Sequence, residues 1–503
     1  MYKSIFSSIA FSVFPFFTSV VQATEVITSA SKENDKRPNV LFIAVDDLNT
    51  WLHVLDSPQS YSPNIDRLAE KSVVFTHTYC AAPYSGPSRA ATLTGRQPFS
   101  SGYYTHVKQT NFRDNVQLCD VVTLPQYFKE HGYETMGSGK IFHEVVDSVS
   151  WNNYYPSMHE ARPAETFQKK ISIDYNADGN IKWGTAKWAD GKRGKMGDEV
   201  VAEWVAGQLN TQRDKPFFLG AGFYKPHLPW IVPQEFYDLY ALNDIVLPEI
   251  NPNDLDDIPE VGLRMNRKCI HDVIVSKGLW ERAVQAYLSC VSFTDSCIGR
   301  ILEAYENSPE RDNTIIVLWS DHGWSLGSKF HWQKMALWEE ETKCTFMIHI
   351  PGVTDRGARC TSAVSLLDIY PTLLDLCGLP ANPNLEGKSI APLLQNPTAE
   401  WNHPVITTWG ENNYSVRSNR YRYIRYYDGG EELYDHQTDS LEWTNLASKR
   451  RYAGIKSHLK AYLPDPKNVK PMNPKVAHSF YAPTNIKNRA LDAWKTLNYN
   501  KNK

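Results

Sequence analysis

The chain has 503 residues, which is long enough for one large domain and a smaller one. Hydrophobic residues make up 42% of it and charged residues 22%, an ordinary composition for a globular protein. The formal net charge is only −3, so no field of one sign favours nucleic acid or an anionic membrane surface as a partner.

The first residues have the pattern of a secretory signal peptide. Lys3 gives a positive start, Ile5 to Val21 is mostly apolar, and Val21-Gln22-Ala23 fits a small-residue cleavage site. A transmembrane anchor is the alternative, but the apolar stretch is short and is interrupted by several serines and Pro15. We therefore expect residues 1–23 to be removed and the mature chain to be periplasmic or secreted, with no membrane span.

Predicted strands alternate with helices along most of the chain. Helical patterns open at Ser62-Pro63, run from Thr123 to Gly132, and cover residues 365–377. Apolar and β-branched runs, typical of strands buried on both faces of a parallel sheet, occur at 39–45, 217–222, 314–319 and 344–350. This alternation predicts an α/β sheet.

Three segments depart from this alternation. Residues 144–200 are rich in Trp, Tyr, Gly, Asp and Lys, and we interpret them as a long loop insertion that either contributes to specificity or forms ordinary surface. The tail from Pro464 either wraps the body or is loosely ordered. A second, antiparallel subdomain is predicted by short alternating strands at 405–409, 414–417 and 421–427. We therefore expect an α/β domain over 24–395 and a C-terminal α+β subdomain with an extended tail over 396–503.

The most specific motif runs from Ser85 to Gly95 and reads Ser-Gly-Pro-Ser-Arg-Ala-Ala-Thr-Leu-Thr-Gly. Pro87 is typical of the start of a helix, where its missing N–H costs nothing. Ser85 is then expected just before a helix N-terminus, where free N–H groups and the helix dipole stabilise an anion, and Arg89 adds positive charge one turn later. A lone serine at such a place is ordinarily only a helix cap, but a cap leaves the Pro-Ser-Arg run and the Leu-Thr-Gly ending unexplained.

Acidic residues follow two of the predicted strands. Asp46-Asp47 comes directly after 39–45, and Asp321-His322 comes just after 314–319. Ligands of open α/β sheets collect at the carboxyl ends of the strands. Neighbouring carboxylates repel one another unless a proton or a cation lies between them, and a hard divalent ion with oxygen ligands resolves this. For Asp46-Asp47 alone, a solvated turn residue and a cap are the alternative. Together with Ser85, the residues favour a shared metal centre.

Further cations and imidazoles follow strand-like runs. Lys140 and His143 follow one such run, His227 follows another, and Lys334 lies in the loop after Asp321. Each histidine considered alone is more often a hydrogen-bonded structural residue than a catalytic one. The Gly-Lys pair at Lys140 is not a phosphate-binding loop, because the Gly-x4-Gly-Lys-Ser/Thr spacing is missing.

The motif at Ser85 resembles that of the type I sulfatase family, in the alkaline-phosphatase superfamily. The family's motif is Cys or Ser, any residue, Pro, Ser, Arg and a short run ending in Thr-Gly, and here Ser has the leading place. The resemblance covers nearly all of residues 37–450. Within the family the chain is most similar to the iduronate-2-sulfatase branch and related bacterial polysaccharide sulfatases. The segments that carry this similarity are Gly139-Lys140-Ile141-Phe142-His143, Lys225-Pro226-His227-Leu228-Pro229 and Ser320 to Gly327.

The resemblance implies a fold, an activity and a set of site residues. The implied fold is alkaline-phosphatase-like α/β, with a large mixed sheet flanked by helices and a smaller C-terminal antiparallel sheet. The implied activity is that of a sulfuric ester hydrolase in which a maturation enzyme oxidises Ser85 to formylglycine (3-oxoalanine). By matched position, the ligands of a Ca²⁺ ion would be Asp46, Asp47, Ser85, Asp321 and His322. Three cations, Arg89, Lys140 and Lys334, would hold the sulfate oxygens. His143 would act as a base, and His227 would face the leaving oxygen.

The same resemblance suggests a substrate class. Export and the branch favour a sulfated oligo- or polysaccharide, such as algal ulvan or carrageenan, with a glycosaminoglycan as the alternative. Ser328-Lys329 stands after Gly327 where the branch has Glu-His, a difference that concerns substrate contacts and leaves the metal centre intact. Candidate contacts are Trp230, Trp324 and Lys329.

Two other functions compete with this interpretation. A phosphoric-ester hydrolase of the same superfamily would use a serine nucleophile and two zinc ions, and it would need a second ligand set with more histidines. A catalytically inactive sugar-binding protein would use aromatic side chains to stack on sugars, but the 12% aromatic content also suits an ordinary core.

Overall fold

The computed structural model describes residues 37–473, except 58, 107–110, 144, 159–165, 174–180 and 188–191. The predicted signal peptide and most of the predicted tail lie outside the described residues. Residues 38–503 form a unit separate from residues 1–37. Within the described part of the chain, we find no helix with both the length and the apolar character that crossing a membrane requires.

A mixed sheet of eight strands forms the centre of the unit. Its order is β15 (Ala358–Cys360), β2 (Val73–Phe75), β14 (Phe346–His349), β10 (Thr314–Ser320), β1 (Asn39–Val45), β8 (Phe217–Phe223), β4 (Glu134–Gly139) and β5 (Asn153–Ser157). β1 pairs in parallel with β10 and β8, and β8 pairs in parallel with β4. β14 runs antiparallel to both of its neighbours, β10 and β2. β5 also pairs in parallel with β4. The predicted mixed sheet is confirmed, and the carboxyl ends of five adjacent parallel strands lie at one edge.

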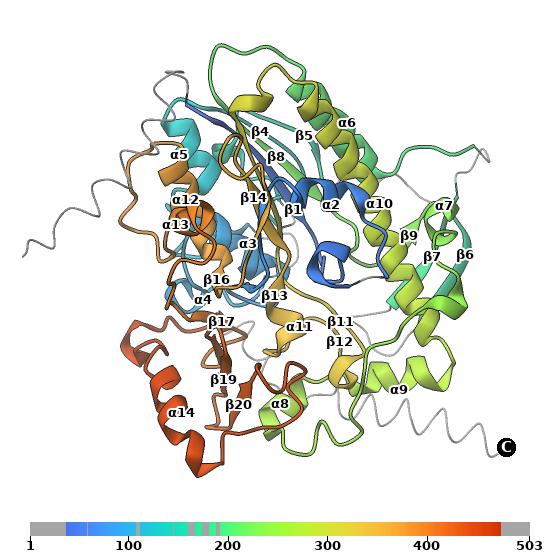
Figure 1. The fold of residues 1–503 in the computed structure, drawn as a ribbon, viewed down its shortest axis with the longest axis vertical. Coiled ribbons are helices and arrows are strands. Elements are labelled where there is room, and N and C mark those ends of the chain that lie inside the picture. The colour runs from blue at the N-terminus through green and yellow to red at the C-terminus, as the bar shows by residue number, and fades with distance from the viewer. Residues whose placement is uncertain are drawn as a thin grey trace, which may run out of the picture. The chain divides into compact units, whose positions relative to one another are not determined.

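Helices cover both faces of this sheet (Figure 1). On one face, Leu41 and Ile43 of β1 pack in a core with α6 (Gly197–Leu209) and α10 (Trp280–Glu306). On the other face, Phe42 packs in a second core with α5 (Leu124–Glu130) and α12 (Ile369–Leu376). Successive side chains of β1 therefore enter opposite cores, as predicted for a strand buried on both faces.

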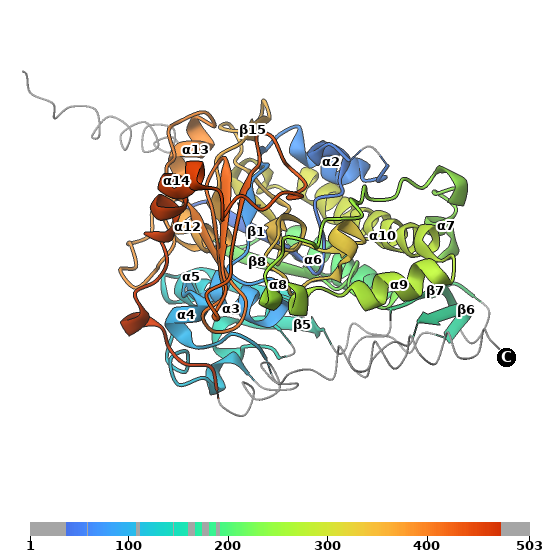
Figure 2. The same ribbon diagram turned by 90° about the horizontal axis from the view of Figure 1, so that it is seen from below.

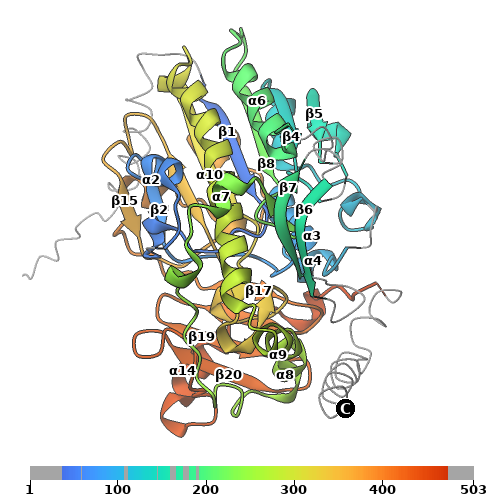
Figure 3. The same cartoon turned by 90° about the vertical axis from the view of Figure 1, so that its right-hand side faces the viewer.

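The segment 144–200 is not the long loop that its composition suggested. It contains β5, which extends the central sheet, and an antiparallel hairpin of β6 (Thr166–Ile173) and β7 (Ile181–Lys187). β7 pairs in parallel with β9 (Trp230–Val232), and Figure 3 shows the hairpin beside α10. Ile181 and Trp183 alternate along β7 and are both buried in the first core, which is what makes this segment a strand.

A separate antiparallel sheet follows near the C-terminus, as predicted. Its strands are β17 (Val405–Thr408), β18 (Tyr414–Arg417), β19 (Tyr421–Arg425) and β20 (Glu431–Asp435), and α14 (Ala453–Lys460) packs on β19 (Figure 2). Thr408 N–H donates to the Ala81 carbonyl over 2.8 Å, which joins this sheet to the segment that leads to Ser85. Other helices of the described residues are α2 (Pro63–Ala69), α3 (Ser85–Thr94), α4 (Pro98–Ser101), α7 (Gln234–Tyr237), α8 (Glu260–Met265), α9 (Lys268–Ser276), α11 (Glu339–Thr342) and α13 (Ala391–Gln395).

Candidate active site

Ser85 is the first residue of α3, one position further into the helix than the sequence suggested. The residue before it, Tyr84, has extended backbone angles and forms the N-cap, and Gly95 ends the helix in a left-handed conformation with φ 68°. Every residue of α3 is buried. The Ser85 side chain therefore lies at the positive end of a helix that is shielded from solvent, where negative charge is stabilised.

Three carboxylates converge on this serine. Asp46 and Asp47 follow β1, Asp321 follows β10, and all three side chains are fully buried. The Asp47 N–H donates to Asp321 Oδ1 over 3.1 Å, and the Ser85 hydroxyl lies 3.3 Å from Asp46 Oδ1. Parallel pairing of β1 with β10 places the two acidic turns side by side. The predicted gathering of acids at one sheet edge is present in the structure.

Three buried cations interleave with the carboxylates. Arg89 donates through Nε to Asp321 over 3.0 Å and through Nη2 to Asp46 over 3.2 Å. Lys140 forms an ion pair with Asp46, and Lys334 pairs with Asp47. Lys334 Nζ also lies 3.1 Å from the Ser85 hydroxyl oxygen. Three positive charges thus match three negative ones around a single serine, in a region where an unmatched charge would be strongly disfavoured.

Two glycines let Lys140 reach this cluster. The Lys140 N–H donates to the Gly222 carbonyl over 2.8 Å. A Cβ atom on Gly222 would lie 2.2 Å from the Lys140 carbonyl carbon, so no larger residue fits there. Gly139 has φ 74°, a left-handed conformation that favours glycine.

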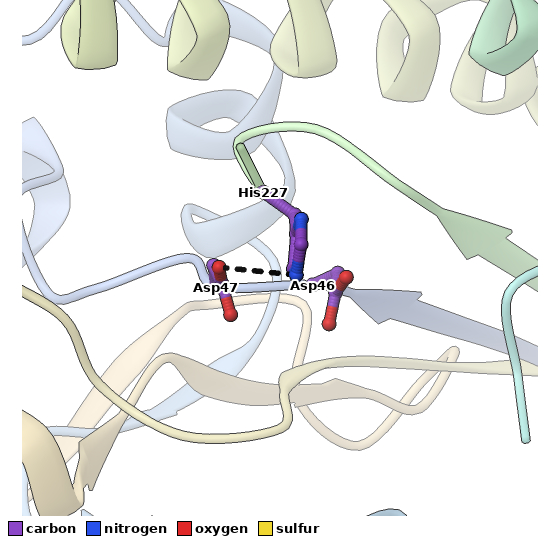
Figure 4. A group of neighbouring side chains, drawn as sticks. All are labelled: Asp46, Asp47 and His227. Carbon is purple, nitrogen blue, oxygen red and sulfur yellow. Dashed lines mark ion pairs between the residues drawn. The ribbon is translucent and has the colours of Figure 1, made fainter. Parts of the chain in front are cut away.

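Two histidines present a ring nitrogen to the carboxylates. His322 Nδ1 donates to the Gly323 carbonyl over 2.9 Å, which leaves Nε2 facing the Ser85 hydroxyl over 2.9 Å. His227 Nδ1 donates to the Leu228 carbonyl over 2.6 Å, and its Nε2 lies 3.8 Å from Asp47 Oδ2 (Figure 4). Since a carbonyl can only accept, each Nε2 carries the lone pair in the neutral ring, the tautomer that a metal ligand requires.

His143 lies in this neighbourhood but contacts another histidine. Its ring centroid is 3.8 Å from that of His106, and His106 stacks on Tyr84 at 4.6 Å. Burial, with Lys140 next in importance, lowers the pKa of His143 well below its usual value. Burial also lowers the pKa of His106, to about 3. Both rings are therefore neutral near pH 7, which suits a proton acceptor and permits their close contact.

The donor set fits a divalent cation. Among the described residues, one carboxylate oxygen of the cluster, Asp47 Oδ2, is buried without a hydrogen bond. Burial raises the pKa of Asp47 to about 7, although Lys334 opposes the shift. Asp47 also shares metal-compatible spacing with Asp46 and His227 on one side, and with Asp321 and His322 on the other. Carboxylate oxygens in this number are ligands that hard cations such as Ca²⁺ and Mg²⁺ prefer.

A match to a family model shows which family of proteins has this site. The sulfatase family model matches residues 38–379, which include every residue of the cluster. The chain belongs to the sulfatase family. A second model, described as the C-terminal part of N-sulphoglucosamine sulphohydrolase, matches residues 327–468. The resemblance predicted from the sequence is confirmed, and the chain is a sulfuric ester hydrolase.

Relatives of this sulfatase include enzymes from bacteria and mammals. It is 40% identical to a sulfatase of Formosa agariphila, over 88% of this chain and 89% of that one. It is 30% identical to mouse iduronate 2-sulfatase, over 69% of each chain, and 26% identical to an ulvan-active sulfatase of Formosa agariphila, over 89% of this chain and 84% of that one.

Solved structures share the fold. A protein solved in complex with its substrate D-glucosamine-2-N,6-O-disulfate superposes with a TM-score of 0.68 and 21% identity, covering 85% of this chain and 96% of that one. A phosphonate monoester hydrolase of Silicibacter pomeroyi superposes with a TM-score of 0.69 and 19% identity, covering 84% of this chain and 94% of that one. At these identities the likeness establishes the fold, which serves more than one ester hydrolysis.

The three predicted substrate contacts of the sulfatase are buried. Trp230 and Trp324 are 0% and 2% exposed and pack edge to face within the first core. Lys329 is 6% exposed and donates to Asp254 and to the Glu442 carbonyl. None of the three presents enough surface to contact a saccharide in this structure. Trp324 nevertheless contacts the cluster, because Lys334 Nζ lies over its ring, 5.4 Å from the ring centroid.

Two residues near the cluster were absent from the sequence predictions. The Tyr287 hydroxyl donates to the Asp47 carbonyl over 2.8 Å and accepts from the Asn49 N–H over 2.8 Å, which pins the turn where Asp47 has φ 60°. His106 lies against Gly86, whose added Cβ atom would come within 2.5 Å of the His106 ring. Tyr287 belongs to the regular apolar face of α10, and no spacing in the sequence marks His106.

Proposed function

We propose that this sulfatase is exported and hydrolyses sulfate esters of a sulfated carbohydrate, using Ca²⁺ and a formylglycine formed from Ser85. The single observation that carries the proposal is the position of the Ser85 hydroxyl, within 3.3 Å of Asp46, His322 and Lys334. A signal-peptide pattern at residues 1–23 supports export. The relatives that are named for ulvan and for iduronate 2-sulfate chemistry favour a sulfated oligo- or polysaccharide, algal or glycosaminoglycan.

The residues that would hold the cation surround position 85. They are Asp46, Asp47, Asp321 and His322, with the side chain of residue 85 itself as a further ligand. A bound Ca²⁺ together with a hydrated formylglycine would supply a polarised sulfuryl oxygen and an activated hydroxyl nucleophile. Asp47 Oδ2, which is buried without a hydrogen bond, and the lone pair on His322 Nε2 are atoms that would bind the ion.

The buried cations would bind the sulfuryl group. Arg89, Lys140 and Lys334 are matched by three carboxylates in the described cluster, so adding a divalent ion leaves an excess of positive charge there. An anionic sulfate ester would offset this excess positive charge. Because the donors are fixed and dry before the substrate arrives, they stabilise developing negative charge without reorganising.

The two remaining histidines would move protons. His143 is neutral near pH 7 and lies on the Lys140 side of the cluster, which suits a base toward the residue at position 85. His227 lies in the segment after β8 and faces Asp47, and protonation of its Nε2 would let it donate to the leaving sugar oxygen. Proton transfers of this kind contribute roughly 10²–10⁴-fold in rate.

The rival phosphoric-ester hydrolase would need a second metal centre. The two metal-compatible groups beside Ser85 share Asp47 and together describe one centre, which supports a single cation. A catalytically inactive sugar-binding protein is disfavoured because the nucleophile position, the acids and the cations all lie in one cluster.

A paired assay tests the proposal. Protein matured in a cell that modifies Ser85 is incubated with sulfated ulvan, carrageenan and glycosaminoglycan fragments and with 4-nitrophenyl phosphate, with Ca²⁺ or with a chelator. We expect sulfate release that depends on Ca²⁺ and far exceeds phosphate release. Equal or faster phosphate release, or undiminished sulfate release after chelation, would overturn it. Secretion of the mature chain lacking residues 1–23 tests export separately.

A further inference from the structure

Arg267 reaches the two residues that flank Lys334. It lies between α8 and α9, and its guanidinium donates through Nη1 to Gln333 Oε1 over 2.5 Å and through Nη2 to Met335 Sδ over 3.2 Å. Lys334 is the cation whose Nζ lies 3.1 Å from the Ser85 hydroxyl. Arg267 is half-buried, so the residue keeps some contact with solvent.

The acceptors that hold Arg267 are neutral. An amide oxygen and a thioether sulfur are weak partners for a guanidinium compared with a carboxylate. Other arginines whose guanidinium hydrogen bonds the described structure shows also form ion pairs, as Arg113 does with Asp147 and Arg213 with Glu134. Within the described residues Arg267 has no such carboxylate, and the nearby Asp272 is paired with Lys268.

The side chain that the Arg267 backbone contacts is a neutral histidine. His331, whose Nδ1 accepts from the Arg267 N–H over 3.1 Å, is buried, and burial and Arg267 together lower its pKa to about 3. Unlike Arg89, Lys140 and Lys334, Arg267 has no ion-paired carboxylate among the described residues.

The loop that contacts Arg267 is also tied to the segment that leads to Ser85. The Met335 N–H donates to the Pro83 carbonyl over 3.1 Å, two residues before Ser85. Met335 and Tyr84 pack against the same apolar cluster. Gln333 and Met335 have φ 73° and 79°, left-handed conformations that only surrounding contacts maintain. The loop that carries Lys334 therefore holds Arg267 at a set position relative to the nucleophile.

We propose that Arg267 binds a second anionic group of the substrate, a carboxylate or a further sulfate, while the ester being cleaved lies at Ser85. This inference rests on the proposed function. Arg267 offers two or more parallel donors, the geometry that matches a carboxylate or sulfate, and an anion would replace partners that leave its charge unmatched. The substrate is then a saccharide that carries at least two negative groups, and Arg267 determines that preference.

The test compares substrates that differ by one charge. The probes are a monosulfated disaccharide that contains a hexuronic acid, the same disaccharide with its carboxyl group reduced to the alcohol, and a disulfated form of the reduced compound. Variants are Arg267→Gln, Arg267→Lys and, as a control with the same charge change, Arg264→Gln, whose exposed side chain pairs with Glu260. Equilibrium binding is measured in parallel on protein with unmodified Ser85, so turnover does not obscure affinity.

We expect Arg267→Gln to raise KM and weaken binding about ten- to hundredfold for the probes with two anions, and about twofold or less for the reduced probe, with kcat unchanged. Arg267→Lys should recover part of the loss and Arg264→Gln should show none. The carboxylate and disulfated probes separate the two kinds of anion, and a loss with either one supports the proposal. Equal losses on all three probes, or a fall in kcat alone, would overturn it and assign Arg267 to the positioning of Lys334. Absence of wild-type turnover on every probe would instead count against the proposed function.

Discussion

The hydroxyl of Ser85 lies 2.9 Å from Nε2 of His322, although 237 residues separate them in the chain. The contact exists because α3 begins where β10 ends, and because the Ser88 hydroxyl donates to the Asp321 carbonyl and ties the helix to that strand end. Helix and sheet are thereby joined at the point where the chemistry takes place. Changes at either partner should be felt at the cation site.

Replacing Asp47 with Asn should weaken Ca²⁺ binding. The amide keeps the shape of the side chain but removes a charge from the residue shared by both metal-compatible groups. We expect a loss of about tenfold or more in Ca²⁺ affinity, measured by calorimetry on chelator-treated protein. Asp295→Asn is the control, because Asp295 is buried and binds the N-terminus of α2 instead. Unchanged Ca²⁺ affinity in Asp47→Asn would contradict the ligand set.

Replacing His227 with Ala should slow the hydrolysis of sugar sulfates more than that of 4-nitrophenyl sulfate. An alkoxide leaving group needs a proton, whereas nitrophenolate leaves without one. Burial lowers the pKa of His227, with Asp46 opposing and Lys140 adding to the shift. Since the protonated ring is the donor, kcat/KM for sugar sulfates should fall as pH rises through that pKa. We expect the variant to lose about 10²–10⁴-fold on sugar sulfates and its pH dependence to flatten; equal losses on both substrates would assign His227 another role.

Truncating His106 should disturb His143. The centroids of the two rings lie 3.8 Å apart, and His106 also stacks on Tyr84. His106→Ala removes the support, and a small misplacement of a catalytic group can cost about 10²-fold in rate. His106→Phe keeps a stacking ring and should retain most of kcat. Steady-state kinetics on one sulfated disaccharide distinguishes the two variants, and equal activity in both would show that the contact does not position His143.

Replacing Arg422 with Met should destabilise the C-terminal sheet. Arg422 is fully buried and pairs with Glu339 and Glu442. Burial alone would raise the pKa of Glu442, but Arg422 and His436 outweigh it and lower the pKa to about 2. Removing the arginine takes one buried partner from each of these two carboxylates, for a loss of about 3–5 kcal/mol in the free energy of unfolding. Denaturant melts at pH 7 check this value, with exposed Arg420→Met as the matched control.

The pairing of Arg422 with Glu442 also makes the free energy of unfolding depend on pH. A carboxyl group whose pKa is lowered on folding contributes stability above its unfolded value of 4.5, and that contribution is lost as pH falls toward about 2. Wild-type protein should therefore lose stability over that window. Arg422→Met should lose less there, because much of the contribution is already absent at pH 7. A wild-type slope retained in full by the variant would contradict the assignment.

The sequence predicted the sheet edge and the cluster well, for a physical reason. The strands at 39–45 and 314–319 are continuous apolar runs, and parallel strands bring their carboxyl ends together, so Asp46, Asp47 and Asp321 had to lie close if the strands were neighbours. The motif at Ser85 added the helix N-terminus. Each of these patterns is local in the sequence, and each determines where its residues lie in the fold.

Other features depend on contacts that no local pattern shows. The hairpin of β6 and β7 is a sheet only because Ile181 and Trp183 bury against helices far away in the sequence. Trp230 and Trp324 have the residue type of sugar contacts, but tertiary packing places them in the core. No periodic pattern in the sequence predicts that His106 contacts His143, because the burial of such residues depends on the whole fold.

Mass spectrometry of the peptide that contains Ser85, from the same preparations used for sulfate release, tests whether Ser85 must become formylglycine for activity. We predict that the fraction of peptide lacking one pair of hydrogen atoms, the mark of formylglycine, rises in proportion to specific activity between cells with and without a maturation enzyme. Full turnover by protein whose residue 85 is entirely unmodified serine would contradict it.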